Sequence, residues 1–389
     1  MTVTAAQGFT AAGIAAGIKE NGNPDLALVV NTGPRLAAAG VFTSNRVKAA
    51  PVLWSEQVLK SGQLSAVVLN SGGANACTGP KGFQDTHATA EKVAESLNAA
   101  GFEETGAGTV AVCSTGLIGV LLPMDKLLPG VDQAVAHLSP HGGEKAAIAI
   151  KTTDTVHKTS VHTGDGWTVG GMAKGAGMLA PGLATMLVVL TTDADVDSDV
   201  LDRALRAATR TTFDRVDSDG CMSTNDTVLL LASGASEVTP EYGEFAEAVR
   251  VVCDDLGQQL IRDAEGAGKD IKVEVINAAT EDDAVEVGRS IARNNLLKCA
   301  IHGEDPNWGR VLSAIGTTRA AFEPDQLNVA INGVWVCKNG GVGEDRDLVD
   351  MRYREVHIVA DLAAGGATAT IWTNDLTADY VHENSAYSS

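Results

Sequence analysis

Residues 170–195, GGMAKGAGMLAPGLATMLVVLTTDAD, contain the most abrupt change in residue composition along the 389-residue chain. The first half holds five glycines and one proline, which favour an irregular loop because glycine tolerates unusual backbone angles and proline lacks an amide donor. The second half is a dense apolar run that begins at Thr185 and is typical of a buried strand. We therefore predict that a flexible or strained loop passes directly into a strand at Thr185.

A threonine at such a junction has a chemical use. Its hydroxyl can attack the carbonyl of the preceding residue, and hydrolysis of the resulting ester frees an N-terminal threonine. The freed residue carries a nucleophilic hydroxyl and an α-amine whose ordinary pKa of about 7.7 to 8.0 suits it to act as its own general base. The residues alone leave a second interpretation open, in which Thr185 is an ordinary β-branched residue that opens a strand.

Two short apolar runs upstream predict buried strands, at residues 65–70 (SAVVLN) and 109–114 (TVAVCS). They lead into the loops SGGANACTG and TGLIG, which are rich in glycine and hydroxyl residues. Between them, residues 86–100 carry Ala, Val and Leu at helical spacing. The order strand, helix, strand indicates an α/β fold.

The chain downstream continues the α/β pattern. Apolar residues repeat every three or four positions over residues 245–260, which predicts an amphipathic helix whose exit presents Glu265. A second helix is predicted to begin with Thr280 as N-cap, because an acidic residue follows three positions later. Residues 356–360 and 367–372 alternate as strands, and the last ten residues are polar.

The charge balance excludes several classes of partner. The 49 acidic and 29 basic side chains give a net charge of -20, which repels nucleic acid and anionic lipid surfaces. No basic side chain precedes Lys19, so a secretory signal is not expected, and no apolar run approaches the length of a membrane helix. We therefore expect a cytoplasmic protein that binds neither nucleic acid nor a membrane.

The cysteines are spaced too widely for a zinc site, more than 30 residues apart and without a C-x-x-C pair. We expect reduced structural thiols and no metal. The six positions are Cys77, Cys113, Cys221, Cys253, Cys299 and Cys337.

Residues 174–187, KGAGMLAPGLATML, resemble the cleavage motif of the ornithine acetyltransferase family, K-G-x-G-M-x-x-P-x-x-A-T-M-L. Further blocks resemble that family in the same order along nearly the whole chain. They are residues 11–19 (AAGIAAGIK), 41–52 (VFTSNRVKAAPV), 70–79 (NSGGANACTG), 114–119 (STGLIG), 152–155 (TTDT), 223–228 (STNDTV) and 301–310 (IHGEDPNWGR).

This resemblance implies a layered αββα sandwich with an N-terminal nucleophile, and a smaller α/β domain in the C-terminal half. It places self-cleavage between Ala184 and Thr185, which would give an α chain of residues 1–184 and a β chain of residues 185–389. Thr185 would be the nucleophile, with its α-amine as base. The cleaved halves would assemble as an α2β2 heterotetramer.

The resemblance also implies roles for residues far from the cleavage motif. Thr115 and Gly116 match the oxyanion-hole pair, with the threonine hydroxyl and the glycine N–H as donors. Lys174 matches a lysine that binds the substrate α-carboxylate, and Glu265 matches a glutamate that binds its amino end.

Four further positions complete the implied substrate site, together with Thr185 itself. Asn384 and Ser389 match a C-terminal pair, which implies that the polar tail folds back over the site. A frayed terminus is the alternative for this tail. The TTDT block supplies one substrate-contacting threonine, either Thr152 or Thr153.

The implied activity is transfer of acetyl from N2-acetylornithine to glutamate in arginine biosynthesis, through an acetyl-threonine ester and without a cofactor. Three alternatives stay open: a bifunctional enzyme that also uses acetyl-CoA, a self-cleaved threonine amidase or aminopeptidase, and an uncleaved binding protein. Cys221 and Met222 replace an acid and a hydroxyl residue of the family pattern, which concerns the fit of the acceptor. The sequence also leaves open whether the enzyme serves general arginine biosynthesis or a specialised pathway.

Overall fold

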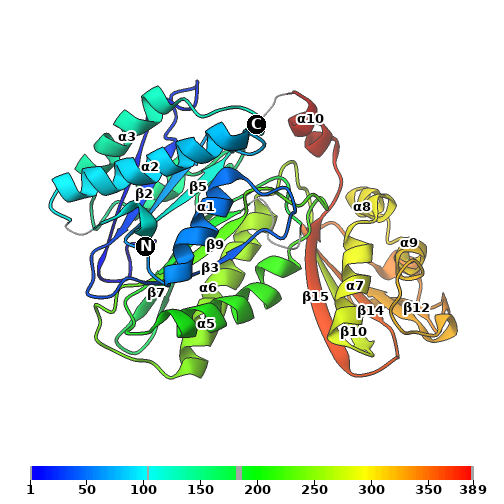
Figure 1. The fold of residues 1–389 in the computed structure, drawn as a ribbon. Helices are drawn as coiled ribbons and strands as arrows, with labels where there is room; N and C mark the ends of the chain where they lie inside the picture. The colour runs from blue at the N-terminus through cyan, green and yellow to red at the C-terminus, as the bar shows by residue number, and fades with distance from the viewer. Residues whose placement is uncertain (1, 103–104, 181–185, 387–389) are drawn as a thin grey trace.

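The computed structural model describes residues 2–102, 105–180 and 186–386 of the chain. Figure 1 shows a large layered unit and a smaller unit formed by the C-terminal part of the chain. Within the described residues, the strands form three sheets, two of them in the large unit. The α/β fold expected from the sequence is confirmed.

The first sheet of the large unit has the order β1-β2-β4-β5. Its neighbours pair antiparallel except β4 and β5, which are parallel and are joined through the long helix α2 (Gly79–Ala99). The strands are β1 (Phe9–Ile14), β2 (Leu26–Asn31), β4 (Ala66–Ser71) and β5 (Val110–Thr115).

The second sheet has the order β3-β9-β8-β7-β6. Its central pair, β8 and β9, is parallel, and its other neighbours are antiparallel. The strands are β3 (Ala37–Phe42), β6 (Lys158–Thr163), β7 (Thr168–Lys174), β8 (Leu187–Thr192) and β9 (Thr227–Ala232).

The two sheets pack face to face around a shared apolar core. Val67 and Leu69 of β4 belong to the same buried cluster as Leu187 and Val189 of β8. Because successive strand residues point to opposite faces, Val188 of β8 faces the other side and packs with the outer helices. This double burial explains why β8 is a continuous apolar run in the sequence.

Helices cover both outer faces of the sandwich, as Figure 1 shows. Apolar residues of α2 and α3 pack on the first sheet, and those of α5 and α6 pack on the second. The resulting αββα layering, which the resemblance implied, is confirmed. The further helices of this unit are α1 (Ala50–Val58), α3 (Met124–Ala136), α4 (Gly143–Ala149), α5 (Ser198–Thr211) and α6 (Tyr242–Arg262).

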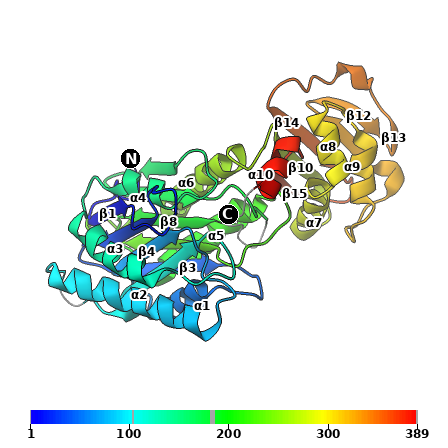
Figure 2. The ribbon, with the colours of Figure 1, turned by 90° about the horizontal axis from the view of Figure 1, so that it is seen from above.

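The smaller unit is a sheet with the order β13-β12-β11-β14-β10-β15, covered by helices α7 and α9. It confirms the expected smaller α/β domain and lies beside the sandwich in Figure 2. Its elements are β10 (Asp270–Ala278), α7 (Glu281–Ala292), α8 (Asn295–His302), α9 (Trp308–Ile315), β11 (Asn328–Ile331), β12 (Val334–Lys338), β13 (Gly341–Val342), β14 (Glu355–Asp361) and β15 (Ala367–Asn374).

The last described helix, α10 (Ala378–Ala386), follows β15 and lies between the two units in Figure 2. It returns the polar C-terminal segment toward the sandwich. Of the helices in the described ranges, none combines the length and apolar character needed to cross a membrane.

Part of the predicted loop before Thr185 is a strand, so that boundary was wrong. Gly170 and Gly171 lie within β7, where the neighbouring chain leaves no room for a side chain. A Cβ at Gly170 would lie 2.3 Å from the carbonyl oxygen of Thr2, and one at Gly171 would lie 2.7 Å from a methyl group of Leu190. These glycines serve close packing instead of an irregular backbone. The junction at Thr185 itself lies outside the described residues.

Candidate active site

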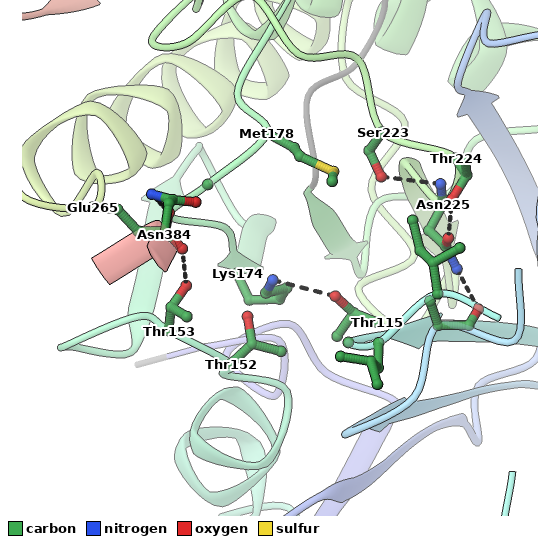
Figure 3. Close-up of a pocket in the computed structure, with 15 residues that line it drawn as sticks. Thr115, Thr152, Thr153, Lys174, Met178, Ser223, Thr224, Asn225, Glu265 and Asn384 are labelled. Carbon is green, nitrogen blue, oxygen red and sulfur yellow. Dashed lines mark hydrogen bonds between the residues drawn. The ribbon is translucent and has the colours of Figure 1, made fainter. Parts of the chain in front are cut away.

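A cavity of about 270 Å³ opens beside the ends of β5 and β7. Residues that sequence analysis singled out from distant parts of the chain line it together (Figure 3). They are Thr115, Gly116, Thr152, Thr153, Lys174, Glu265 and Asn384. The remaining candidates, Ala184, Thr185 and Ser389, lie outside the described residues.

Thr115 is the last residue of β5 and Gly116 follows it, where the chain turns beside residues 71–73, the SGG loop. Gly116 has φ of +124°, a backbone conformation that favours glycine, and a Cβ there would lie 2.7 Å from the backbone of Gly72. The amide of Gly72 donates to the Thr115 carbonyl at 3.0 Å. The glycines of the two loops are thus required by this close approach, which fixes the donor pair at the cavity wall.

Lys174 is the last residue of β7, and its side chain is almost fully buried below the cavity. Its ammonium group donates to Thr115 Oγ1 at 3.3 Å, as the dashed line in Figure 3 marks. Since that oxygen accepts, the Thr115 hydroxyl hydrogen remains available to donate toward a ligand. Burial lowers the pKa of Lys174, and the neighbouring carboxylate of Asp154 partly offsets this effect.

Glu265 forms the acidic end of the cavity, just beyond the C-terminus of α6. Its Oε1 accepts a hydrogen bond from the Thr153 hydroxyl at 2.7 Å, and its Oε2 accepts one from the Asn384 amide at 3.0 Å. Asn384 therefore brings α10 to the cavity, in agreement with the expected return of the tail as far as the described residues extend. These two donors hold the carboxylate in place.

The glycine-rich loop after β7 closes around Glu265. A Cβ at Gly177 would lie 2.6 Å from the Glu265 carboxylate, so any other residue at this position would require that carboxylate to shift. The Glu265 amide in turn donates to the Ala176 carbonyl at 3.0 Å. The KGAGML segment thereby positions Lys174 and Glu265 relative to each other.

Sequence analysis did not assign a role to Asn225, which joins three segments at the cavity wall. Its Nδ2 donates to the Ala74 carbonyl at 2.6 Å and to the Ser114 carbonyl at 2.8 Å. Ser223 and Thr224 line the cavity beside it. The only signal in the sequence was a polar STND run directly before a buried strand, because the partners lie over 100 residues away.

Asp226, another residue that sequence analysis missed, directly precedes β9 and contacts the residue before β8. It is fully buried, and its Oδ1 accepts a hydrogen bond from the Met186 amide at 3.1 Å. Burial raises the pKa of Asp226 well above its usual range, because it disfavours the charged form of the carboxyl group. It fixes the residue that directly follows Thr185 in the chain.

The described cavity therefore offers a cation at one end, a carboxylate at another and a hydrogen-bond donor pair beside the cation. A ligand with both an α-carboxylate and a distant ammonium group can pair with Lys174 and Glu265 at the same time. A carbonyl placed at Thr115 and Gly116 would have its developing negative charge stabilised. The volume lies near the lower end of ligand pockets, about 300 to 1,000 Å³, and suits a small amino-acid derivative.

The αββα sandwich is that of the N-terminal-nucleophile fold, and the donor-lined cavity suits an enzyme that transfers acyl groups. The comparison with protein families is more specific, because the ArgJ family model matches residues 10–389. The chain therefore belongs to the ArgJ family.

Two similar proteins named ArgJ agree with this assignment, and one solved structure is also similar in sequence. The chain is 90% identical over 389 residues to the arginine biosynthesis bifunctional protein ArgJ of Streptomyces avermitilis, with 100% of both chains covered. It is 63% identical over 388 residues to the protein of the same name from Thermobifida fusca, again with 100% of both covered. A crystal structure of ornithine acetyltransferase complexed with ornithine from Mycobacterium tuberculosis is 64% identical, covers 48% of this chain and 96% of that chain, and has a TM-score of 0.46.

Proposed function

We propose that this protein is a glutamate N-acetyltransferase of arginine biosynthesis, which moves acetyl from N2-acetylornithine to glutamate. Self-cleavage between Ala184 and Thr185 would divide it into residues 1–184 and 185–389, with Thr185 as nucleophile. The observation that carries the proposal is the convergence of residues from distant segments on one cavity. They are Thr115, Thr152, Lys174, Glu265 and Asn384.

In the first half-reaction, the Thr185 hydroxyl attacks the acetyl carbonyl carbon and passes its proton to its own α-amine. Thr115 and Gly116 stabilise the oxyanion of the tetrahedral intermediate. The bond between the acetyl carbon and nitrogen then breaks, and the proton moves to the departing α-nitrogen of ornithine. The products are free ornithine and an acetyl-threonine ester.

In the second half-reaction, the neutral amine of glutamate attacks the ester carbonyl at the same donor pair. The attacking amine gives up a proton to the Thr185 α-amine, which passes it to the Thr185 oxygen as the carbon–oxygen bond breaks, and N-acetylglutamate leaves. No step needs a cofactor, because the acyl group is carried by the enzyme itself. Water must be kept from the ester, since hydrolysis would give acetate instead.

Two groups in the cavity fit the charges of N2-acetylornithine. Lys174 would pair with the α-carboxylate and Glu265 with the side-chain ammonium. Thr152 is the better candidate for the substrate-contacting threonine, because the hydroxyl of Thr153 already donates to Glu265. Asn384 would hold Glu265 from the opposite side.

The test is an exchange assay with N2-acetylornithine labelled in its acetyl group and glutamate labelled in its amine. The proposal predicts N-acetylglutamate that carries both labels, and it predicts little acetate. Acetate without N-acetylglutamate would instead identify an amidase. Because the similar proteins are named bifunctional, the same assay should include acetyl-CoA as a second donor.

The resemblance further supports an assembly of two α and two β chains, and the lack of a basic start or a long apolar run in the sequence supports a cytoplasmic location. Sedimentation analysis of the purified protein tests the assembly, since the proposal predicts a native mass of twice the 40.1 kDa chain. A species of one chain mass would contradict it.

A further inference from the structure

Asp154 lies at the centre of a buried charge network below the cavity, and no role has been given to it above. Its side chain is fully buried, and Oδ1 accepts hydrogen bonds from the Lys158 ammonium at 2.6 Å and from the Gly175 amide at 2.7 Å. Its Oδ2 accepts one from the Thr152 amide at 3.0 Å and lies 3.9 Å from the Lys174 ammonium.

These contacts connect Asp154 to both ends of the substrate site. Lys174 and Gly175 belong to the end of β7 and to the loop after it, which form the cationic end. The turn that Asp154 holds through Thr152 also carries Thr153, whose hydroxyl donates to Glu265 at the acidic end. A single carboxylate thus fixes the spacing between the two charged recognition groups.

We propose that Asp154 is the positioning residue of the substrate site, which holds the Lys174 ammonium charged and aimed into the cavity so that it can pair with a substrate carboxylate. The substrate part of this inference rests on the function proposed above. The part that concerns Lys174 and Asp154 rests on their contacts and burial and does not depend on that function.

The charged groups around Lys174 show why Asp154 is decisive. Burial opposes the charged form of Lys174, and Asp154 is the strongest influence in the other direction. Lys158 repels it, although Lys158 is itself paired with Asp154 and with Asp263 at 2.5 Å. The other groups that act on Lys174 are the carboxyl groups of Glu265 and Asp226 and the ammonium of Lys19.

The groups around Asp154 likewise favour its charged form. Burial acts to raise the pKa of this carboxyl group, but the ammonium groups of Lys174 and Lys158 and the Gly175 amide outweigh it. The pKa of Asp154 is therefore held well below its usual range, and the group stays ionised at every pH at which the enzyme would work.

The effect of removing the Asp154 charge on the pKa of Lys174 can be predicted in direction. Without Asp154, burial and Lys158 would lower the pKa of Lys174 further, so Lys174 would lose its proton at a lower pH. Binding of a substrate carboxylate, which needs the charged lysine, would then be lost as the pH rises. The charged fraction falls about tenfold for each pH unit above the pKa.

The experiment compares KM for N2-acetylornithine across pH 6 to 10, roughly the span around the usual α-amine and lysine pKa values, in the native enzyme, Asp154→Asn and Asp263→Asn. The ratio of KM in Asp154→Asn to native KM should grow with pH, toward about tenfold per unit. Because the same substrate is used, its own titration cancels in this ratio. Asp263→Asn is the matched control, since it also removes one carboxylate partner of Lys158 but is not among the groups that act on Lys174, and its ratio should stay flat.

A ratio for Asp154→Asn that is raised equally at every pH would overturn the inference, because a purely structural role predicts that result. If this variant does not fold, Asp154→Glu replaces it. That variant keeps the charge but moves it by one methylene, so it should raise KM by the same factor at every pH and leave kcat near the native value, whereas general damage to the site would lower kcat as well. Native KM values in Asp154→Glu would contradict positioning.

A second measurement does not depend on catalysis. The pKa of Lys174 is followed by NMR in protein with isotopically labelled lysine, with Lys174→Met to assign the signal. The inference predicts a lower pKa in Asp154→Asn than in the native protein and is overturned by an unchanged one. If the native protein transfers no acetyl, the proposed function fails while this measurement still decides the role of Asp154.

Discussion

Thr115 is held at the cavity wall by its backbone contact with the SGG loop and by the ammonium of Lys174. Its hydroxyl hydrogen is therefore available to donate to a ligand, which is the property that an oxyanion donor requires. Valine keeps the methyl group and the backbone of threonine but lacks the hydroxyl group, so a change to valine tests the hydroxyl group alone.

We predict that Thr115→Val lowers kcat about 100- to 1,000-fold, a loss of about 2.7 to 4 kcal/mol of transition-state stabilisation, and changes KM little. Steady-state acetyl transfer measures this. Thr10→Val is the control, since Thr10 also carries a buried hydroxyl, without a partner among the described residues, on β1. Equal kcat in Thr115→Val and the native enzyme would remove Thr115 from the mechanism.

Glu265 gives a second prediction at the scale of a residue. Glu265→Gln keeps the shape of the side chain but loses the charge, so the side-chain ammonium of ornithine loses its ionic partner. A hydrogen bond to a charged group contributes about 1.5 to 3 kcal/mol, so KM for N2-acetylornithine should rise about 10- to 100-fold. N2-acetylnorvaline, which lacks the ammonium group, should bind both proteins equally. A loss of the same size for both ligands would show that Glu265 does not recognise that group.

How far the site was predictable from sequence differs between residues. The positions that match the family blocks could be named, and the structure brings the described ones together around one cavity. Asp154 and Asn225 could not be named, because their roles depend on partners that are distant in the chain. Lys174 lies 20 positions after Asp154, and the carbonyl partners of Asn225 belong to two other segments.

Local signals predicted several elements closely. The strands expected at residues 65–70 and 109–114 are β4 and β5, each displaced by one residue. Thr280 caps α7 as predicted, because its side chain accepts from the Asp283 amide at 3.1 Å. The helix expected at residues 86–100 begins earlier, at Gly79, since a proline in its first turn is compatible with a helix start.

The turn after β5 gives a prediction at the scale of an element. Alanine at position 116 would have a positive φ, and its Cβ would lie 2.7 Å from the backbone of Gly72. Alanine at position 119 would also have a positive φ, of +83°, but its Cβ would lie in open space. Gly119→Ala should cost about 1 kcal/mol of stability, and Gly116→Ala about 3 kcal/mol or more. Chemical denaturation measures both variants.

Gly116→Ala should also reduce acetyl transfer, because the displaced turn moves both oxyanion donors. Equal stability and activity in the two variants would show that the contact between the β5 turn and the SGG loop does not constrain the site.

The whole molecule interleaves the two segments that the proposed cleavage would create. In the second sheet, β8 and β9 follow position 185 in the chain but lie between β3 and β7, which precede it. The shared core likewise contains buried residues from both segments. The sequence patterns could not reveal this interleaving, because the pairing partners β3 and β9 are separated by more than 180 residues.

We therefore predict that the cleaved protein stays together as one particle without a covalent link. Each fully buried Val or Leu contributes about 1.5 to 3 kcal/mol, so separation of the segments would expose a large part of two cores. Gel filtration of the cleaved protein should give one peak that contains both fragments. Two peaks under native conditions would be inconsistent with this sheet order.

The central claim is that one residue, Thr185, supplies both the nucleophilic hydroxyl and the basic amine. The most direct measurement is mass spectrometry of the purified enzyme after brief exposure to N2-acetylornithine without glutamate. The account predicts two fragments, residues 1–184 and 185–389, with one acetyl group attached through oxygen to the first residue of the second fragment. An undivided chain that transfers acetyl at the full rate, or an acetyl group on any other residue, would contradict it.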